Sequence, residues 1–405
     1  MSQVPAQNAK EKPATTRNKT VLSSAIVLYF VICFEILIMI SPFAGFFYSA
    51  FNPFLLGLAS NDATRWLSAF FFVHLMVPPD FFLKFIRVAG SVLFTLGITV
   101  FFICALQVYA SKFFKTGPAL KGLYSRIRHP QYLFLGVSGI GLAILWPRFL
   151  VVVLWIAMML VYYLLARDEE RRMRKQFPET YPRYMETSGM FLPKGLEQAI
   201  GFSTVAGRLA VFLAVSAMAL GGAFLLRDYT VNHLPLWKSS NIVALPIVPD
   251  DRRMLDHRMS DILQLDAVKS RLKPDQSYLV YMVPPGYIMQ GLIGDTGGDW
   301  QLYKQHHSIS MITDWIIHPF GHLEGGHHGH MGAPPADGGM TSGFVRRLIF
   351  VKVNEPLSKA GDAFAINAVR TPDFMIDIDV HELSVREVKT LPRETAWGRV
   401  PTPSF

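Results

Sequence analysis

The stretch Gly122-Leu-Tyr-Ser-Arg-Ile-Arg-His-Pro-Gln-Tyr132 stands at the start of two apolar segments, residues 132–147 and 149–166. Trp146-Pro147-Arg148 separates these segments. Because a proline ends one helix and lets the chain turn back, we expect the pair to form a helical hairpin. The hairpin places strongly polar groups at a membrane interface, where they are costly unless they bind something.

The composition indicates an integral membrane protein. Of 405 residues, 51% are hydrophobic, and several apolar runs have about the 20 helical residues that cross a bilayer core. We therefore expect an all-α, multi-pass membrane domain over residues 21–226, with about five spanning helices. Residues 44–85 are apolar but interrupted, and they are predicted to be interfacial or half-inserted. The expected spans are residues 21–43, 86–110, 132–147, 149–166 and 205–226.

The distribution of basic residues predicts the orientation in the membrane. Residues 111–208 carry 14 Lys and Arg against 6 Asp and Glu, whereas residues 227–405 carry 18 against 20. Since basic loops stay cytoplasmic, we expect residues 1–20 to form a cytoplasmic tail and the chain after Arg227 to lie outside the cytoplasm. The net charge of +9 then reflects one membrane face and not nucleic-acid binding.

The last part of the chain has the pattern of a separate domain. Residues 227–258 are rich in proline and are predicted to be a linker, and residues 259–405 are predicted to form a β-rich extracytoplasmic domain. Asp377, Asp379 and His381 are expected on a charged, solvent-facing side of a strand, with metal ligation as the alternative. The expected elements are a helix over 259–272 and strands over 277–283, 345–353, 363–369 and 374–380.

Histidines are concentrated in one loop of this domain, residues 306–340. Imidazole and thioether groups together suit copper, and imidazole alone also suits zinc. The glycines of the loop would let it wrap an ion, but they equally describe a flexible, solvated segment. Both interpretations stay open for the candidate ligands His306, His307, His318, His322, His327, His328 and His330.

The hairpin and the sequence after it resemble the isoprenylcysteine carboxyl methyltransferase and phospholipid methyltransferase family. The resemblance covers about residues 86–195. One departure is Phe134, where the family usually has a glycine. The matching positions are Arg128, His129, Pro130 and Tyr132, then Glu169 and Glu170, then Phe177, Tyr181, Tyr184 and Pro193.

The resemblance implies S-adenosylmethionine as the cofactor, and the residue types agree with it. The cofactor carries a carboxylate, an ammonium group, ribose hydroxyls and a sulfonium. Arg128 and His129 can donate to the carboxylate, and Glu169 or Glu170 can accept from the ammonium or the ribose. We expect His129, Glu169 and Glu170 to be catalytic. The expected cofactor-binding residues are Tyr124, Arg128, His129, Tyr132, Glu169 and Glu170.

Three functions are compatible with these patterns. The leading one is a membrane methyltransferase acting on a lipophilic acceptor such as a prenylcysteine carboxylate or an aminophospholipid. The second is a non-catalytic metal-handling or accessory protein on the same helical framework, which the large exported domain and Phe134 favour. The third is a membrane lipid reductase. The expected partners are a membrane lipid or lipidated substrate and an extracytoplasmic protein, without nucleic acid.

Overall fold

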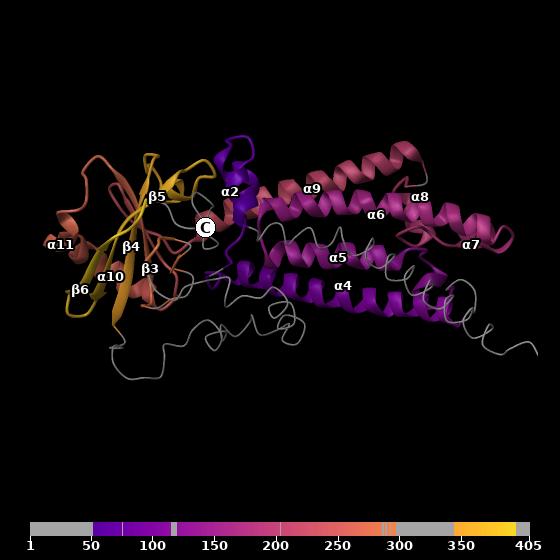
Figure 1. Cartoon of the computed structure of the whole chain (residues 1–405), viewed down its shortest axis with the longest axis horizontal. Helices are drawn as coiled ribbons and strands as arrows, with labels where there is room; N and C mark the ends of the chain where they lie inside the picture. Colours follow the sequence, from indigo (N-terminus) through magenta and orange to yellow (C-terminus); the bar gives the residue numbers. More distant parts are fainter. Residues whose placement is uncertain are drawn as a thin grey trace, which may run out of the picture.

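A computed structural model describes residues 52–393, except 75, 115–119, 203, 286, 288–289, 292 and 297–343. These residues form a long bundle of helices with a β-sheet domain at one end (Figure 1). The predicted tail 1–20, the predicted span 21–43 and the histidine-rich loop lie outside the described residues.

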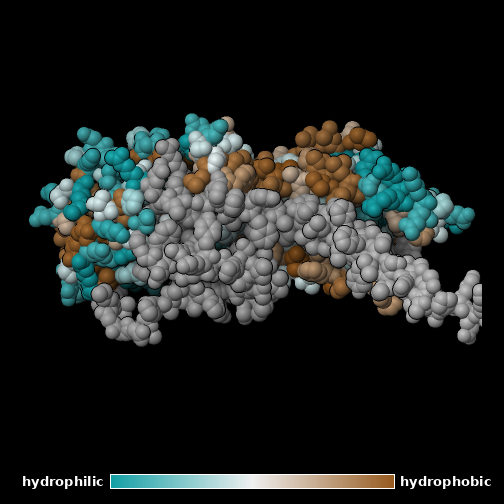
Figure 2. Space-filling model, viewed as in Figure 1, coloured by the Kyte–Doolittle hydropathy of each residue, from teal (hydrophilic) through white to brown (hydrophobic). Residues whose placement is uncertain are grey.

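Four helices form the bundle: α4 (Phe81–Phe113), α5 (Pro130–Leu145), α6 (Phe149–Gln176) and α9 (Val205–His233). In the described part of the chain, α4, α6 and α9 are long and apolar enough to cross a membrane, and α5 is a shorter apolar helix of 16 residues. Brown, apolar atoms of the bundle lie between hydrophilic surfaces at its two ends (Figure 2). The chain therefore has the build of a membrane protein, while the expected number of five spans stays a prediction.

Small residues bring α4 and α5 into close contact. A Cβ added to Gly141 of α5 would lie 2.3 Å from the backbone nitrogen of Phe94, and one added to Gly97 of α4 would lie 2.5 Å from that of Ser138. Such small residues let helix backbones approach closely in a membrane. The predicted hairpin is present as α5 and α6, which are joined through Trp146–Arg148, and Trp155 Nε1 of α6 donates to Gly136 O of α5 at 2.8 Å.

The described part of the segment predicted to be interfacial packs between the bundle and the sheet domain, and its position relative to the membrane stays a prediction. This part contains α2 (Asn52–Ser60) and α3 (Arg65–Ser68), followed by a buried apolar run from Ala69 to Val73. All residues of this run except Phe70 belong to the main hydrophobic core. Phe71 N donates to Pro147 O at 2.8 Å, and Phe149 N donates to Ala69 O at 3.1 Å. These bonds attach the segment to the turn of the hairpin.

Three guanidinium groups also hold this segment. Nη2 of Arg87, from α4, donates to the backbone oxygens of Val73, His74 and Met76 at 2.7, 3.2 and 3.1 Å. Arg148, from the hairpin turn, donates to Ser68 O. Arg227, from α9, donates to Phe70 O and, in the sheet domain, to Phe364 O. Irregular backbone cannot bond to lipid, so these arginines satisfy carbonyls that the helices leave exposed.

The sheet domain is a mixed sheet of six strands in the order β1-β2-β3-β4-β5-β6. Strands β2 and β3 are parallel, with α10 (Asp251–Gln264) and α11 (Asp266–Lys269) between them in the chain, and the other neighbours are antiparallel. The strands are β1 (Trp237–Ser239), β2 (Ile242–Pro246), β3 (Ser277–Val283), β4 (Val345–Val353), β5 (Arg370–Asp379) and β6 (Ser384–Thr390).

Two expectations for this region are wrong. The predicted linker 227–258 contains the end of α9, β1, β2 and the start of α10, and β2 is buried along its whole length. The expected strand at 363–369 is instead the end of the 3-10 helix η5 (Ala360–Phe364) followed by a turn. The expected helix begins earlier, at Asp251, because the apolar side chains that pack on the sheet start at Leu255.

Both faces of the sheet are covered. One face packs with the ends of the bundle helices in a single core that includes Ala223, Leu234, Val243 and Met375, while the other face packs against α10. The expectation that Asp377 and Asp379 face solvent is therefore wrong. Arg347 binds both oxygens of Asp377, and Asp379 accepts from backbone nitrogens of the following turn.

Candidate active site

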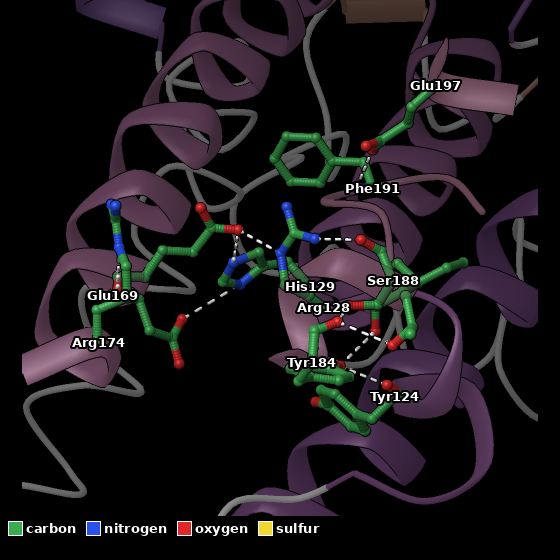
Figure 3. Close-up of polar contacts among 12 residues, drawn as sticks. Tyr124, Arg128, His129, Glu169, Arg174, Tyr184, Ser188, Phe191 and Glu197 are labelled. Atoms are coloured by element: carbon green, nitrogen blue, oxygen red, sulfur yellow. Dashed lines mark hydrogen bonds and ion pairs between the residues drawn. The ribbon is translucent and has the colours of Figure 1, made fainter. Parts of the chain in front are cut away.

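Five elements meet at the end of the bundle that lies away from the sheet. They are the 3-10 helix η2 (Gly122–Ser125), the start of α5, the end of α6, α7 (Thr180–Thr187) and α8 (Lys194–Ala199). Pro130 is the first residue of α5, where its missing N–H costs no hydrogen bond, so Arg128 and His129 precede the helix. The antiparallel hairpin then returns the chain to the same end, where Glu169 and Glu170 lie near the end of α6. Figure 3 shows Glu169 beside His129 and Arg128.

These four residues form one cluster of charges. Nε of Arg128 donates to Glu170 Oε1 at 2.5 Å, and Nη1 donates to Ser188 O. His129 Nδ1 lies 3.4 Å from Glu169 Oε2, and His129 Nε2 lies 3.5 Å from Glu170 Oε1. Both imidazole nitrogens are within ion-pair distance of a carboxylate but make no close hydrogen bond. The structure thus brings together the basic and the acidic halves of the predicted site.

Burial differs strongly within the cluster. His129 is 2% exposed and Glu170 is 4% exposed, whereas the side chain of Glu169 is 31% exposed. Burial opposes a charge on His129, but the two glutamates outweigh it and hold the pKa of the imidazole above its ordinary value. Protonation of His129 would, together with Arg128, balance the charges of the two carboxylates.

A loop from residues 188 to 193 fixes the backbone of Arg128 and His129. Arg128 N donates to Gly189 O at 2.8 Å and His129 N donates to Met190 O at 3.0 Å. Gly189 has no space for a side chain, because a Cβ there would lie 1.9 Å from Leu192 O. Glu197 of α8 closes the loop, since its Oε1 accepts from Phe191 N at 2.7 Å and Leu192 N at 3.1 Å.

The two tyrosines expected to bind the cofactor have different environments. The Tyr124 hydroxyl donates within the protein, to Gln131 Oε1 at 2.9 Å, and its backbone oxygen accepts from the Tyr184 hydroxyl. Tyr132 stacks on His129, with ring centroids 5.7 Å apart, and on Tyr162, with centroids 5.1 Å apart. Tyr132 therefore lies directly against the charged cluster, whereas Tyr124 holds η2 and α5 together.

Sequence reasoning missed the contributions of Ser188, Phe191 and Glu197. Ser188 acts through its backbone oxygen, which no side-chain pattern reveals. The Phe191 ring contacts His129 at a centroid distance of 6.1 Å. The signal for Glu197 was present, because an acidic residue in the first turn after Pro193 is placed to accept from free backbone nitrogens.

The metal expectation has no support in the part of the chain that the structure describes. No group of three or more His, Cys, Asp or Glu that could hold a metal ion occurs there. The seven histidines between His306 and His330 lie outside it, so a copper or zinc site in that loop stays a prediction.

The model of the phospholipid methyltransferase family matches residues 87–180. This match confirms the family resemblance predicted from the motifs, and it contains Arg128, His129, Glu169 and Glu170. No curated protein and no solved structure matches the chain. Together with the apolar helices, the family match supports a membrane methyltransferase; the loop closed by Glu197, α9 and the sheet domain lie outside the matched residues.

Proposed function

We propose, from the match of residues 87–180 to the phospholipid methyltransferase family, that the chain transfers a methyl group from S-adenosylmethionine to a lipophilic acceptor. The observation that carries the proposal is the charged cluster within these residues. Arg128 and His129 from the start of α5 meet Glu169 and Glu170 from the end of α6 within 3.5 Å. A zwitterionic cofactor needs both kinds of charge at one place.

The residues present fit the polar groups of this cofactor. Glu169, the most exposed member of the cluster, is placed to accept from the ammonium or the ribose hydroxyls. Arg128 has no partner for Nη2 among the described residues, so this nitrogen can donate to the carboxylate. Glu170 is occupied by Arg128 and orients it. When bound, the cofactor supplies an electrophilic methyl group on a sulfonium.

The raised pKa of His129 changes the role that the sequence suggested for it. The raised pKa favours the protonated imidazole, which cannot take a further proton, so we assign His129 the role of a charged donor beside the methyl donor. A carboxylate acceptor needs no base. An amine acceptor must lose its proton, and Glu169 is then the carboxylate that receives it. Most of the acceleration comes from holding the acceptor and the methyl group in line.

The acceptor enters this site from the bilayer. A site at the mouth of apolar helices suits a hydrophobic acceptor, and a prenylcysteine carboxylate and an aminophospholipid both meet this condition. On the predicted orientation, the site end of the bundle is cytoplasmic and the sheet domain is extracytoplasmic.

One observation favours the accessory-protein alternative. Arg128 and Glu170 already satisfy each other, with Ser188 O as a further acceptor, so the cluster is stable without a ligand. Phe134, at a position where the family usually has glycine, packs against the core that contains Tyr132. A framework that lost catalysis would have the same two features. The family match favours methyl transfer over the reductase alternative.

Calorimetry on the purified full chain in lipid nanodiscs separates these functions. We expect S-adenosylmethionine to bind, and we expect a reduced nicotinamide and copper to leave the cofactor site unaffected. In a second assay, methyl-labelled cofactor is incubated with the chain and total lipid, and label should appear in the lipid extract. If millimolar cofactor neither binds nor labels lipid, the accessory-protein function replaces the enzyme.

A further inference from the structure

Two arginines from different helices converge on one tyrosine near the site end of the bundle. The guanidinium carbons of Arg167, on α6, and Arg208, on α9, each lie 6.0 Å from the centre of the Tyr163 ring. A ring face attracts a cation, but two guanidiniums near one ring repel each other. Two cationic groups beside one ring therefore make this place favourable for an anion.

Neither arginine has an acidic partner in the described part of the chain. Arg208 Nε is buried and has no hydrogen-bond partner among the described residues. By contrast, Arg171 and Arg172, one turn further along α6, both pair with Asp168. A buried, unpaired N–H of a charged group is costly, so a ligand that accepts from it would stabilise this arrangement.

The start of α9 adds further positive potential at this place. Thr204 caps the helix, with its hydroxyl accepting from Gly207 N at 2.9 Å, and Arg208 lies in the first turn. The N-terminus of a helix attracts anions through its free backbone N–H groups. The start of α9 and the two arginines therefore both attract an anion to this place.

Exposed apolar side chains extend from the arginines toward the middle of both helices. They occur four residues apart, so on each helix they form a row along one face. An acyl chain lying on α6 and α9 would cover these rows, which are Leu160 and Leu164 on α6 and Leu209 and Leu213 on α9.

We propose that Arg167 and Arg208 bind the phosphodiester of a bilayer phospholipid whose acyl chains lie along α6 and α9. A guanidinium matches two phosphate oxygens at once, and the apolar rows distinguish a lipid from a free anion. Arg208 lies outside the family-matched residues 87–180, so the lipid site belongs to this chain's own arrangement of α6 and α9. It does not depend on methyl transfer.

A row of aromatic rings joins the lipid site to the candidate active site. Tyr163 contacts Phe202 at a centroid distance of 6.4 Å, and Phe202 contacts Phe191 at 6.2 Å. Phe191 in turn contacts His129. Packed aromatic side chains therefore connect the lipid site with the charged cluster.

The test measures lipid binding to the full-length chain in detergent, without cofactor. The probes are dioctanoyl phosphatidylglycerol, dioctanoylglycerol and inorganic phosphate, and bound lipid is counted by native mass spectrometry. We expect phosphatidylglycerol to bind more tightly than the other two probes. Arg208→Gln and Arg167→Gln should each weaken it about tenfold, as expected for loss of one charge-assisted contact. Arg208→Lys, which keeps the charge, should bind better than Arg208→Gln.

Arg171→Gln is the matched control, since Arg171 is exposed and already paired with Asp168. The proposal is overturned if the three Gln variants bind phosphatidylglycerol equally well, or if dioctanoylglycerol binds as tightly as the phospholipid. Equal affinity for inorganic phosphate would show a site for free anions and no lipid site. Arg167 is exposed on α6, so Arg167→Gln is expected to fold. This variant therefore tests the proposal even if Arg208→Gln does not fold. Cofactor affinity measured in the same variants should stay unchanged.

Discussion

The two ends of the bundle both bury basic side chains, but they satisfy them in different ways. At the site end, Arg128 and His129 face carboxylates, one of which is partly exposed. At the sheet end, the hydrogen bonds of Arg87, Arg148 and Arg227 within the described residues go to backbone carbonyls. A carboxylate on a side chain can exchange its partner for a ligand, whereas the carbonyls of a packed segment cannot. Arginine is thus placed to bind a ligand at the site end and to stabilise the fold at the sheet end.

The largest expected effect follows from removing the arginine of the site end. Arg128→Ala removes the nearer cationic partner of the buried Glu170 and leaves it with His129, whose Nε2 lies 3.5 Å away. Breaking a buried ion pair costs about 3–5 kcal/mol of stability. Thermal unfolding in nanodiscs should show this loss together with loss of cofactor binding. Adding Glu170→Gln to the same chain should restore part of the stability but not the binding. Equal stability of the single and the double variant would contradict the pairing.

A smaller loss is expected at the sheet end, and it should affect stability alone. Arg148 is 1% exposed, and its guanidinium lies 4.1 Å from the Phe70 ring. Arg148→Met removes the hydrogen bond to Ser68 O and should lower the free energy of unfolding by about 1.5–3 kcal/mol. Cofactor affinity, measured below the melting temperature, should equal that of the wild type. A variant that binds cofactor more weakly without being destabilised would show that the two ends are coupled.

The opposite result is expected for the exposed carboxylate of the cluster. Glu169→Gln should weaken cofactor affinity about tenfold, because it removes one charge-assisted contact. It should change stability little, since the side chain is 31% exposed. Asp168→Asn, at the neighbouring position on the surface of α6, is the control and should leave calorimetric affinity unchanged. Equal affinities of the two variants would remove Glu169 from the cofactor site.

The smallest expected effect is a pH dependence that belongs to the site end. The pKa of folded His129 is raised, so its contribution to stability is complete below the ordinary histidine value of about 6.5 and is lost as the pH rises through the raised value. Melting temperatures from pH 6 upward should therefore fall in the wild type and fall less in His129→Gln. Parallel curves for both proteins would show that His129 is neutral in the folded state.

The sequence predicted those elements whose pattern of apolar residues and prolines lies within the element itself. The proline between two apolar runs predicted the hairpin, and the apolar character of 277–283 and 345–353 predicted β3 and β4 with the observed bounds. The four charged residues of the cluster were also predicted, because the hairpin necessarily returns Glu169 and Glu170 to the end where Arg128 lies.

Contacts that depend on distant parts of the chain were not predictable in this way. Pro246 is part of the predicted linker, but it is the last residue of β2. The strand β2 pairs with β1 and with β3, and β3 begins more than thirty residues after β2. The charges of Asp377 suggested solvent, but its partner Arg347 is on the neighbouring strand. The hydrogen bond from the Tyr124 hydroxyl to Gln131 Oε1 was not predicted either, and the cofactor contact expected of Tyr124 stays a prediction.

The hydrogen bonds of Arg227 have a consequence for how the protein is made. One carbonyl partner, Phe70, precedes it by 157 residues, and the other, Phe364, follows it by 137 residues. During synthesis, α9 enters the membrane long before Phe364 has left the ribosome. At that stage Arg227 can donate to Phe70 O but not yet to Phe364 O. The 3-10 helix η5, which ends at Phe364, completes this contact. A chain that terminates before Phe364 would therefore leave a buried charge incompletely bonded and expose it to membrane quality control.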